Sequence, residues 1–599
     1  MLKCARSLTG KFQRSFIPIF PPKTYLRSYK IFNMAPSQDN GQDGRKRGWQ
    51  GDHGAKRRRV QKEKPIKEGS GEEVLIADVR ALFAAQKLSS SSKPAILENP
   101  SDSTNDTPIA GTGLPAREKD AVVESTEEAQ LPAPFTEIEV KVVELSSTGD
   151  GLALQDSSDQ IYVVPFTAPG DTVKVKVIRH FEKEHYSMAD FISVVEPSSL
   201  RDDNRINCKY FGKCSGCQFQ MLDYSTQLQH KKMIVEKAYK NFAQLPPELV
   251  PAIQDTIGSP LQYGYRTKLT PHFDGPPGSN GYGRSKKKVK HSFEEVPPIG
   301  FNEKGRRMVL DIEDCPIGTD AVRMGMKNER ARVAKELDNY EKGATILLRE
   351  STKRVRKEDV QEEETPLNTI QVTRPEYTDF KTCITDNNGT ATEYIDSFVF
   401  TSIAGSFFQN NNSILPVFTQ YIRDHALPTG ASSSEEQKIK YLIDAYSGSG
   451  LFTITLSSIF KSSIGIDVSV PSIKSAHHNA ELNNLSPERC TFMAADAPEL
   501  FKSVKYPADE TVVVIDPPRK GCDESFLSQL LKYGPTRVVY VSCNVHTQAR
   551  DVGVLVRGKE GGARYKIESL RGFDFFPQTG HVEGVAVLSK VEDEKAVEV

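Results

Sequence analysis

The sequence predicts a multidomain protein in which a small β-barrel and a central α+β region precede a C-terminal Rossmann-like α/β domain. Apolar residues alternate in period two over residues 135–196, with turn signals between the runs, as in a barrel of OB-like size. Strand-like apolar runs alternate with helical stretches over residues 397–599, the pattern of a doubly wound domain. Between them, three cysteines fall within ten residues. We therefore expect five segments, with bounds 1–33, 34–133, 134–198, 199–395 and 396–599.

The overall composition fits a globular protein and excludes several classes. The 599 residues include 78 Lys and Arg against 79 Asp and Glu, so a uniformly basic nucleic-acid coat is excluded. No run of 18 or more apolar residues exists that could span a bilayer, and we expect no membrane association. Nine cysteines without a secretory segment indicate a reducing compartment, where a cysteine is more often a ligand or a nucleophile. Nothing indicates an obligate protein partner, and we expect a monomer.

The first 133 residues resemble targeting and linker sequence. Residues 1–33 hold seven basic residues and no acidic one, which is typical of a mitochondrial transit peptide or of a plain basic tail. Met34 is a second plausible start, and two basic clusters follow it within residues 45–59, as in a bipartite nuclear signal or an RNA-contacting arm. Starts at Met1 and Met34 would direct the protein to mitochondria and to the nucleus and cytoplasm. The remainder predicts a disordered linker with one short helix near residues 74–88.

Residues 134–198 have the turn chemistry of a small barrel. Turn signals separate the apolar runs at Thr148-Gly149-Asp150-Gly151 and at Pro169-Gly170-Asp171. This order of runs and turns resembles a TRAM domain, an RNA-binding β-barrel. The resemblance implies that the segment contacts RNA.

Four cysteines form a candidate metal site. Cys208, Cys214 and Cys217 lie within ten residues, and soft thiolate ligands select zinc or iron–sulfur clusters. Cys315 is the candidate fourth ligand because it is followed by proline, as in Cys4 cluster sites. The spacing lacks the two-plus-two symmetry of a zinc ribbon. A [4Fe–4S] cluster is therefore favoured, with zinc as the runner-up and four unliganded thiols as the remaining alternative.

Acidic residues at successive strand ends of the last domain predict a nucleotide-like cofactor. The strand at 441–444 leads into a Gly-rich turn at 448–450, at the first βα crevice. Asp467 ends the second strand and is suited to pair with ribose hydroxyls, and Asp496 follows the third and could accept the adenine amino group. These acceptors fit S-adenosylmethionine better than NAD, because no Gly-x-Gly-x-x-Gly is present. A cap of a helix or strand is the alternative for each aspartate alone.

Two later strands end in residues suited to a reaction. The strand 511–515 runs into Asp516 and two prolines, a rigid strand end that holds the carboxylate at the sheet edge. The strand 537–541 ends near Cys543, at the carboxyl edge where ligands bind. The motif Phe-Pro-Gln-Thr-Gly-His-Val-Glu at 576–583 precedes the last strand.

Three motifs in this order resemble the uracil-C5 RNA methyltransferase family: Asp-Pro-Pro-Arg-Lys-Gly at 516–521, Val-Ser-Cys-Asn at 541–544 and the motif at 576–583. The likeness covers about residues 135–599 and points in particular to the fungal tRNA (uracil-C5-)-methyltransferases. It implies a class I methyltransferase fold, S-adenosylmethionine as cofactor and the T-loop of tRNA as substrate. Many members carry a TRAM domain, and some carry a [4Fe–4S] cluster.

The resemblance also implies roles for individual residues. Cys543 is the implied nucleophile, because carbon 5 of uracil reacts only after a thiolate has added to carbon 6. Glu583 is the implied base that removes the C5 proton after methyl transfer. Independently of the resemblance, Cys522 is a rival nucleophile because it lies six residues after Asp516, and His581 could shuttle protons or shape the turn before Glu583. The residues that match family positions contacting the cofactor or the target base are Gln409, Tyr446, Asp467 and Asp516.

A basic stretch predicts contact with RNA. Residues 201–310 hold 18 Lys or Arg against 10 Asp or Glu, and their basic run at 284–290 suits phosphate contact, with a solvated loop as the alternative. Modification at carbon 5 needs the uridine outside its stack, so the substrate is a loop or a flipped base. Three other functions stay open: the same chemistry on ribosomal RNA, a non-catalytic RNA-binding protein, and a zinc-dependent small-molecule methyltransferase. The intact Cys543 and Glu583 argue against the second, and the barrel argues against the third.

Overall fold

The computed structural model describes residues 66–91, 131–156, 158–276, 292–360, 367–428, 438–495 and 501–592. The predicted transit peptide, both basic clusters, the basic run at 284–290 and Asp496 lie outside these residues. Across the described ranges, no helix is long and apolar enough to cross a membrane.

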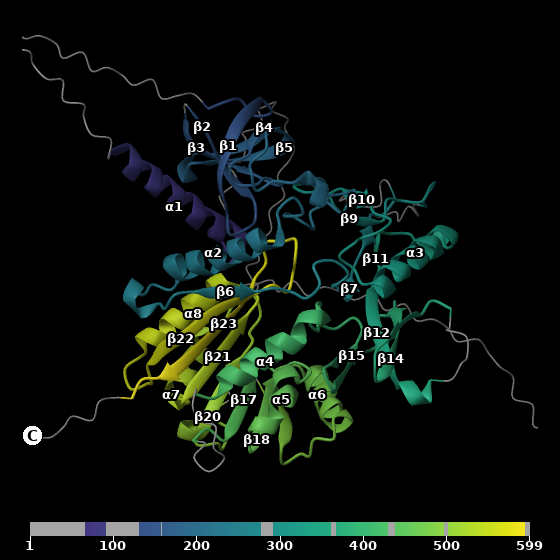
Figure 1. Cartoon of the computed structure of the whole chain (residues 1–599), viewed down its shortest axis with the longest axis vertical. Helices are drawn as coiled ribbons and strands as arrows, with labels where there is room; N and C mark the ends of the chain where they lie inside the picture. Colours follow the sequence, from purple (N-terminus) through teal and green to yellow (C-terminus); the bar gives the residue numbers. More distant parts are fainter. Residues whose placement is uncertain are drawn as a thin grey trace, which may run out of the picture. The chain divides into compact units, whose positions relative to one another are not determined.

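The predicted barrel is present and closed (Figure 1). Its strands are β1 (Glu137–Leu145), β2 (Gly151–Gln155), β3 (Ser158–Val164), β4 (Thr172–Phe181) and β5 (Tyr186–Glu196). They pair in the order β1-β2-β3-β5-β4, with β1 and β4 closing the ring. The alternating valines of β1 and β4 form the core inside it, because the pleat turns every second side chain inward. Gly149 and Gly170 adopt positive φ (+86° and +90°), which explains both predicted turn signals.

A helix from the stretch that the sequence assigns to a linker packs on this barrel. Helix α1 (Gly71–Ser91) buries Leu75, Ile76 and Val79 against residues of β2, β3 and β5. Asp78 is also buried and accepts a hydrogen bond from the backbone N–H of Ser147 (2.5 Å). The helix is therefore part of the folded protein.

Two small sheets and one helix make up the central region (Figure 1). Their elements are β7 (Lys268–Leu269), β8 (His272–Phe273), β9 (Gly300–Asn302), β10 (Val309–Asp311), α3 (Asp320–Lys335), β11 (Ala344–Thr345), β12 (Leu348–Arg356), β13 (Ile370–Thr373) and β14 (Tyr377–Ile384). The sheets have the orders β10-β9-β8-β11 and β13-β14-β12-β7 and share one apolar core with α3. A hairpin of β15 (Thr390–Ile395) and β16 (Phe398–Ile403) leads to the last domain.

The C-terminal domain has the predicted doubly wound fold around an eight-stranded sheet. Its strands are β6 (Gln254–Ile257), β17 (Tyr441–Ala445), β18 (Ser462–Asp467), β19 (Cys490–Ala494), β20 (Thr511–Ile515), β21 (Arg537–Ser542), β22 (Tyr565–Phe573) and β23 (Glu583–Lys590). The order is β19-β18-β17-β20-β21-β23-β22-β6. The first five strands in this order are parallel to one another, and β23 is antiparallel to β21. The order reverses between β17 and β20, where such sheets open a crevice for ligands.

Helices cover both faces of this sheet. They are α2 (Tyr224–Phe242), α4 (Leu415–Ala426), α5 (Leu451–Thr455), α6 (Val470–Leu482), α7 (Glu524–Tyr533) and α8 (Val545–Arg557). One core holds α2, α7 and α8 on one face, and a second holds α4, α5 and α6 on the other. Helix α2 and strand β6 come from residues 224–257, so a stretch that precedes the central sheets packs with the last domain.

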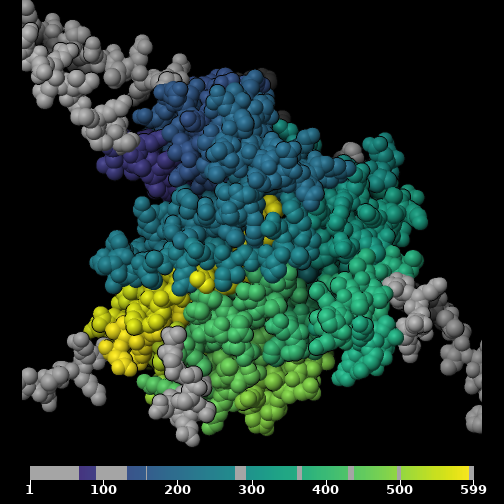
Figure 2. All heavy atoms as spheres, in the orientation of Figure 1, coloured from purple at the N-terminus to yellow at the C-terminus, as the bar shows by residue number. Residues whose placement is uncertain are grey.

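The turn between β22 and β23 connects that domain to the rest of the chain. It rises past α2 toward the barrel, and its yellow atoms emerge among those of the earlier segments (Figures 1 and 2). Gly580 comes so close to the barrel that an added Cβ would lie 3.2 Å from the Cα of Gly149. The barrel, α2 and the last domain therefore meet at this turn.

Candidate active site

One cavity of about 860 Å³ opens at the carboxyl ends of β17, β18, β20 and β21. This is the edge at which open α/β sheets bind ligands. Its wall contains all but one of the catalytic and cofactor residues predicted from the sequence, namely Gln409, Tyr446, Asp467, Asp516, Cys543 and Glu583. The remaining one, Asp496, lies outside the described residues, but its neighbour Ala495 lines the cavity.

The cofactor end of the cavity is formed by the turn after β17 and the end of β18. Asp467 accepts hydrogen bonds from the backbone N–H groups of Gly448 (3.0 Å) and Ser469 (2.7 Å). Gly448 and Gly450 both have positive φ (+53° and +91°), and a Cβ on Gly450 would lie 3.0 Å from the ring of Phe492. The Gly-rich turn predicted at 448–450 thus follows a backbone path in which other residues would be strained.

Two buried groups near this end retain hydrogen-bonding capacity. Ser447 lines the cavity, and its hydroxyl oxygen is buried without a hydrogen-bond partner among the described residues. One carboxylate oxygen of Asp444 also lacks a partner there, while the other accepts from the backbone N–H (2.9 Å) and hydroxyl (2.6 Å) of Thr453. Burial raises the pKa of Asp444 to about 7. Because buried polar groups are normally paired, the Ser447 hydroxyl in the wall fits a polar ligand in the cavity.

Cys543 lies at the reacting end, in the bend between β21 and α8. Asn544 caps α8, so the helix starts directly after the cysteine. Burial, followed by the carboxylates of Glu583 and Asp516, raises the pKa of Cys543 to about 12. The Arg519 guanidinium, which hydrogen-bonds the thiol, acts in the opposite direction. Since the thiolate is the nucleophile, this cation supports the reactive form.

Glu583 is the first residue of β23 and only 3% exposed. Burial raises its pKa well above the usual range, and the nearby Asp516 adds to the effect. The pKa of Asp516 is raised as well, first by burial and then by Asp444. A carboxylate with a raised pKa is a stronger proton acceptor than an exposed one, so Glu583 is suited to act as a general base.

Arg519 belongs to the site although the sequence pattern alone assigns it no role. It lines the cavity with Cys543, and its backbone carbonyl accepts a hydrogen bond from the Asn544 side chain (2.9 Å). Arg519 is the arginine of the Asp-Pro-Pro-Arg-Lys-Gly motif, so the motif contained the residue without indicating its role. A linear motif does not reveal that the guanidinium faces a thiol 24 positions later in the chain.

The N-terminal segment reaches the other side of Cys543. A second cavity of about 270 Å³ is walled there by Gly69, Thr148, Gln218 and Cys543, among others. The Asn544 side chain donates to the carbonyl oxygen of Gly69 (3.2 Å). Residues just before α1 therefore contact the loop that carries Cys543.

Cys522 and His581, the other two candidates for chemistry, differ in position. Cys522 is outside the cavity wall and 5% exposed, with its Sγ 3.7 Å from the hydroxyl of Tyr540. Burial raises its pKa strongly, so it is a poorer nucleophile than Cys543. His581 lines the cavity, and burial followed by nearby cations lowers its pKa to about 4. Its imidazole is therefore neutral at pH 7.

The four predicted metal ligands lie within electrostatic range of one another. The pKa of Cys217 and of Cys315 is raised to about 12 each. Burial is the largest cause, and the neighbouring cysteines add to it. In the part of the chain that the structure describes, no group of three or more His, Cys, Asp or Glu side chains has an arrangement that could hold a metal ion. Cys208, Cys214, Cys217 and Cys315 are free thiols. The metal centre therefore stays a prediction.

Known proteins resemble this chain in sequence over most of its length. The family model for tRNA (Uracil-5-)-methyltransferase matches residues 395–591, and the TRAM domain model matches residues 134–187. The tRNA (uracil(54)-C(5))-methyltransferase of Schizosaccharomyces pombe is 47% identical over 459 residues, which cover 76% of this chain and 79% of the relative. The Saccharomyces cerevisiae protein of the same name is 41% identical over 484 residues, with 76% and 73% covered.

A solved structure shares the fold. The Pyrococcus abyssi tRNA (uracil-54, C5)-methyltransferase, crystallised with S-adenosyl-L-homocysteine, matches with a TM-score of 0.51 at 23% identity, over 75% of this chain and 100% of that one. The TRAM match confirms the barrel type predicted from the turns. With relatives at 47% and 41% identity over most of their own length, the chain belongs to the tRNA (uracil-5-)-methyltransferase family.

Proposed function

We propose that the protein transfers the methyl group of S-adenosylmethionine to carbon 5 of uridine 54 in the T-loop of tRNA. One observation carries the proposal: Cys543 and Glu583 line the same cavity as the ribose acceptor Asp467. Methylation at C5 needs a nucleophile, a base and a cofactor edge in one place. The two yeast relatives, named for uracil 54 of tRNA, support this substrate and position.

Residues at the ends of β17 and β18 would hold the cofactor. Asp467 is positioned to accept from ribose hydroxyls, and the unpartnered Ser447 hydroxyl offers a further polar contact. When bound, S-adenosylmethionine would supply an electrophilic methyl group on a positively charged sulfur, which would keep the bonding electron pair when the methyl group leaves. The cavity of about 860 Å³ lies near the upper end of the usual range for ligand sites, which leaves room for a uracil ring beside the cofactor.

Cys543 starts the reaction on the uracil ring. Its thiolate adds to C6, and the π electrons of the C5–C6 bond move through C4 onto O4 to give an enolate. Arg519 favours the thiolate because it lowers the pKa of Cys543. Carbon 5 of the enolate is then nucleophilic enough to accept the methyl group.

Glu583 ends the reaction. After methylation, C5 carries both the methyl group and the original hydrogen. The Glu583 carboxylate removes this proton, the enolate forms again, and its electrons expel the Cys543 thiolate from C6. The raised pKa of Glu583 suits this step, because it makes the carboxylate a better base near neutral pH.

Methylation of defined RNAs separates this function from its alternatives. With radiolabelled S-adenosylmethionine, a tRNA transcript should gain one 5-methyluridine at position 54, and a transcript with cytidine at that position should gain none. Incorporation into ribosomal RNA but not into tRNA would favour the ribosomal alternative. Binding of tRNA without incorporation into any RNA would favour a non-catalytic RNA-binding protein.

We further propose that Cys208, Cys214, Cys217 and Cys315 hold a [4Fe–4S] cluster, with zinc as the alternative. The type of donor supports the proposal, because thiolates are the ligands that iron–sulfur clusters and zinc select, and the neighbouring thiols add to the raised pKa of Cys217 and of Cys315. The cluster would supply structural support without redox chemistry. It would brace Gln218, the residue after Cys217, whose side chain accepts from the backbone N–H of Gly580 (2.9 Å).

Metal analysis of anaerobically purified protein tests the centre. Iron with acid-labile sulfide, lost in the Cys217→Ser variant, is the expected result. Zinc without sulfide would favour the alternative, and protein without stoichiometric metal would overturn both.

We also propose that translation from Met1 and from Met34 gives mitochondrial and nuclear-cytoplasmic forms, and that each is a monomer. The basic, acid-free residues 1–33 and the two basic clusters after Met34 support the two destinations. Tagged forms expressed from either start should differ in location, and light scattering should give one chain per particle. Identical locations or a stable dimer would contradict these proposals.

A further inference from the structure

One buried lysine holds the turn that leads to Glu583. Lys231, on α2, is fully buried, and its ammonium donates to the carbonyl oxygens of Phe576 (3.0 Å) and His581 (2.7 Å). These carbonyls lie near the two ends of the turn between β22 and β23. The third ammonium proton goes to Asp574 (2.5 Å), so a single cation ties the turn together with all its donors used.

The charge of this lysine is balanced within the same cluster. The Asp574 side chain is fully buried, accepts from the Tyr224 hydroxyl (2.9 Å) through its other oxygen, and also accepts from the backbone N–H of Phe576 (3.1 Å). Burial lowers the pKa of Lys231, whereas Asp574 raises it. An unpaired charge in this position would be strongly disfavoured, so the two residues act as a unit.

A second contact from α2 holds the tip of the turn. The Gln227 side chain accepts from the backbone N–H of Gln578 (3.0 Å) and donates to its side-chain oxygen (3.1 Å). Gln578 has a positive φ of +71°, which is unusual for a residue other than glycine. Such a conformation persists only where the surroundings determine it. Helix α2 therefore fixes a turn that would otherwise relax.

We propose that Lys231 is a positioning residue for the proton-abstraction step, and that it sets the position of Glu583 through the turn 574–582. Glu583 follows His581 by two residues, so a shift of the His581 carbonyl moves the carboxylate. Lys231 is absent from the cavity wall among the described residues, so its action passes through the turn. The inference rests on the proposed role of Glu583 and adds what holds that residue in place.

The test uses a double variant that carries both Lys231→Met and Asp574→Asn. It is compared with the single variants Glu583→Gln and Lys232→Met. The double variant removes both charges at once, so it leaves no unpaired buried charge. Lys232 is the matched control, because it is the next residue of α2 and pairs at the surface with Asp255 (2.9 Å). For each protein we would measure kcat, the KM for tRNA and cofactor, and the methylated protein–tRNA adduct that survives SDS during turnover.

We expect the double variant to lose kcat on the order of 100-fold, as a misplaced group does, and neither KM value to rise, because an intermediate that accumulates before a slowed late step lowers KM. The methylated adduct should accumulate as in Glu583→Gln, because methyl transfer precedes the impaired step. Lys232→Met should match the wild type. If the double variant fails to fold, Lys231→Arg, which keeps the charge but moves the donors, should show the same adduct.

Four outcomes would overturn the inference or its basis in distinguishable ways. A folded double variant with wild-type kcat, or one that loses kcat without accumulating adduct, would overturn the role of Lys231. The same adduct in Lys232→Met would make the effect a general property of α2. A Glu583→Gln variant without adduct would overturn the proposed role of Glu583 itself.

Discussion

The two ends of the catalytic cavity are built from different ranges of the sequence. At the cofactor end, Asp467 is held by Ser469 and by Gly448, only 19 positions away. At the reacting end, Asn544 donates a hydrogen bond to the carbonyl oxygen of Gly69, 475 positions away in the sequence. Lys231 donates one to the carbonyl oxygen of His581, 350 positions away. The cofactor end is a local βα unit. The reacting end is formed where the segment before α1, helix α2 and the last domain meet.

This difference separates binding from chemistry. The turn after β17 and the end of β18 form most of the cofactor end, and the predicted contacts Gln409 and Asp516 also lie outside α1 and α2, so its geometry should survive changes in those two helices. The reacting end depends on supporting contacts from distant segments, and small displacements there should lower kcat. Variants should therefore fall into two groups, with either a raised KM for the cofactor or a lowered kcat.

The largest effect is expected from Cys543→Ala at the reacting end. Loss of the nucleophile should reduce kcat on the order of 10⁴-fold or more, as in other enzymes that lose a covalent catalyst. Cofactor affinity, measured by calorimetry, should stay at the wild-type value, and 5-fluorouridine RNA should form no covalent adduct. Cys522→Ala is the matched control, and a persistent adduct in Cys543→Ala would remove Cys543 from the role.

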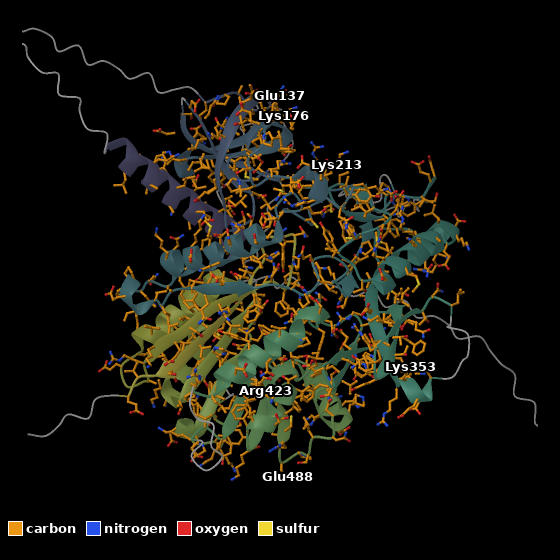
Figure 3. All side chains as sticks on the ribbon, viewed as in Figure 1. Glu137, Lys176, Lys213, Lys353, Arg423 and Glu488 are labelled. Carbon is orange, nitrogen blue, oxygen red and sulfur yellow. The ribbon has the colours of Figure 1, made fainter. Side chains whose placement is uncertain are left out.

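A smaller effect, confined to KM, is expected from Asp467→Asn at the cofactor end. Hydrogen bonds to charged groups contribute about 1.5–3 kcal/mol, which corresponds to a rise of roughly 10- to 100-fold in the KM for S-adenosylmethionine. With saturating cofactor, kcat should stay near the wild-type value. Glu488→Gln is a suitable control, because Glu488 precedes β19 at the opposite edge of the sheet (Figure 3). A large loss of kcat in Asp467→Asn would break the division between the two ends.

The same contrast explains how much could be predicted from the sequence. The barrel, the strand ends and the residues at them were predictable, because each signal lies within a few residues of the chain. The packing of α2 on the last domain, the burial of Lys231 and the approach of Arg519 to Cys543 depend on contacts between distant segments. Such contacts leave no periodic pattern. The short helix near residues 74–88 was predicted, and α1 confirms it, but its packing on the barrel was not, because the barrel strands lie beyond a polar stretch.

The pH dependence should sharpen the description of the reacting end. Since burial raises the pKa of Cys543 to about 12, the thiol is protonated at neutral pH, and its thiolate fraction grows tenfold per pH unit. Single-turnover methyl transfer should therefore accelerate with rising pH until another step limits it. Arg519→Met removes a cation that lowers this pKa, so the rate at neutral pH should fall by roughly tenfold or less and the rise should move to higher pH. A rate that falls with rising pH would contradict the thiol assignment.

The smallest effect is expected where the N-terminal segment meets the reacting end. Glu68 pairs with Arg550 (2.8 Å), which also donates to the carbonyl oxygens of Lys520 (3.1 Å) and Cys522 (3.3 Å) in the loop of Arg519. Because the Glu68 side chain is 68% exposed, this pair contributes about 0–1 kcal/mol. Glu68→Gln should thus lower kcat at most about fivefold, less so at high salt, with the cofactor KM unchanged.

The matched control for this variant is Glu72→Gln, an exposed carboxylate in the first turn of α1. It should leave both constants at their wild-type values, measured in parallel at low and high salt. Equal losses in the two variants would mean that the segment acts through its overall charge and not through Arg550. A raised cofactor KM in Glu68→Gln would contradict the division between the two ends of the cavity. A contact with the N-terminal segment would then affect the cofactor end, and binding and chemistry could no longer be assigned to separate parts of the fold.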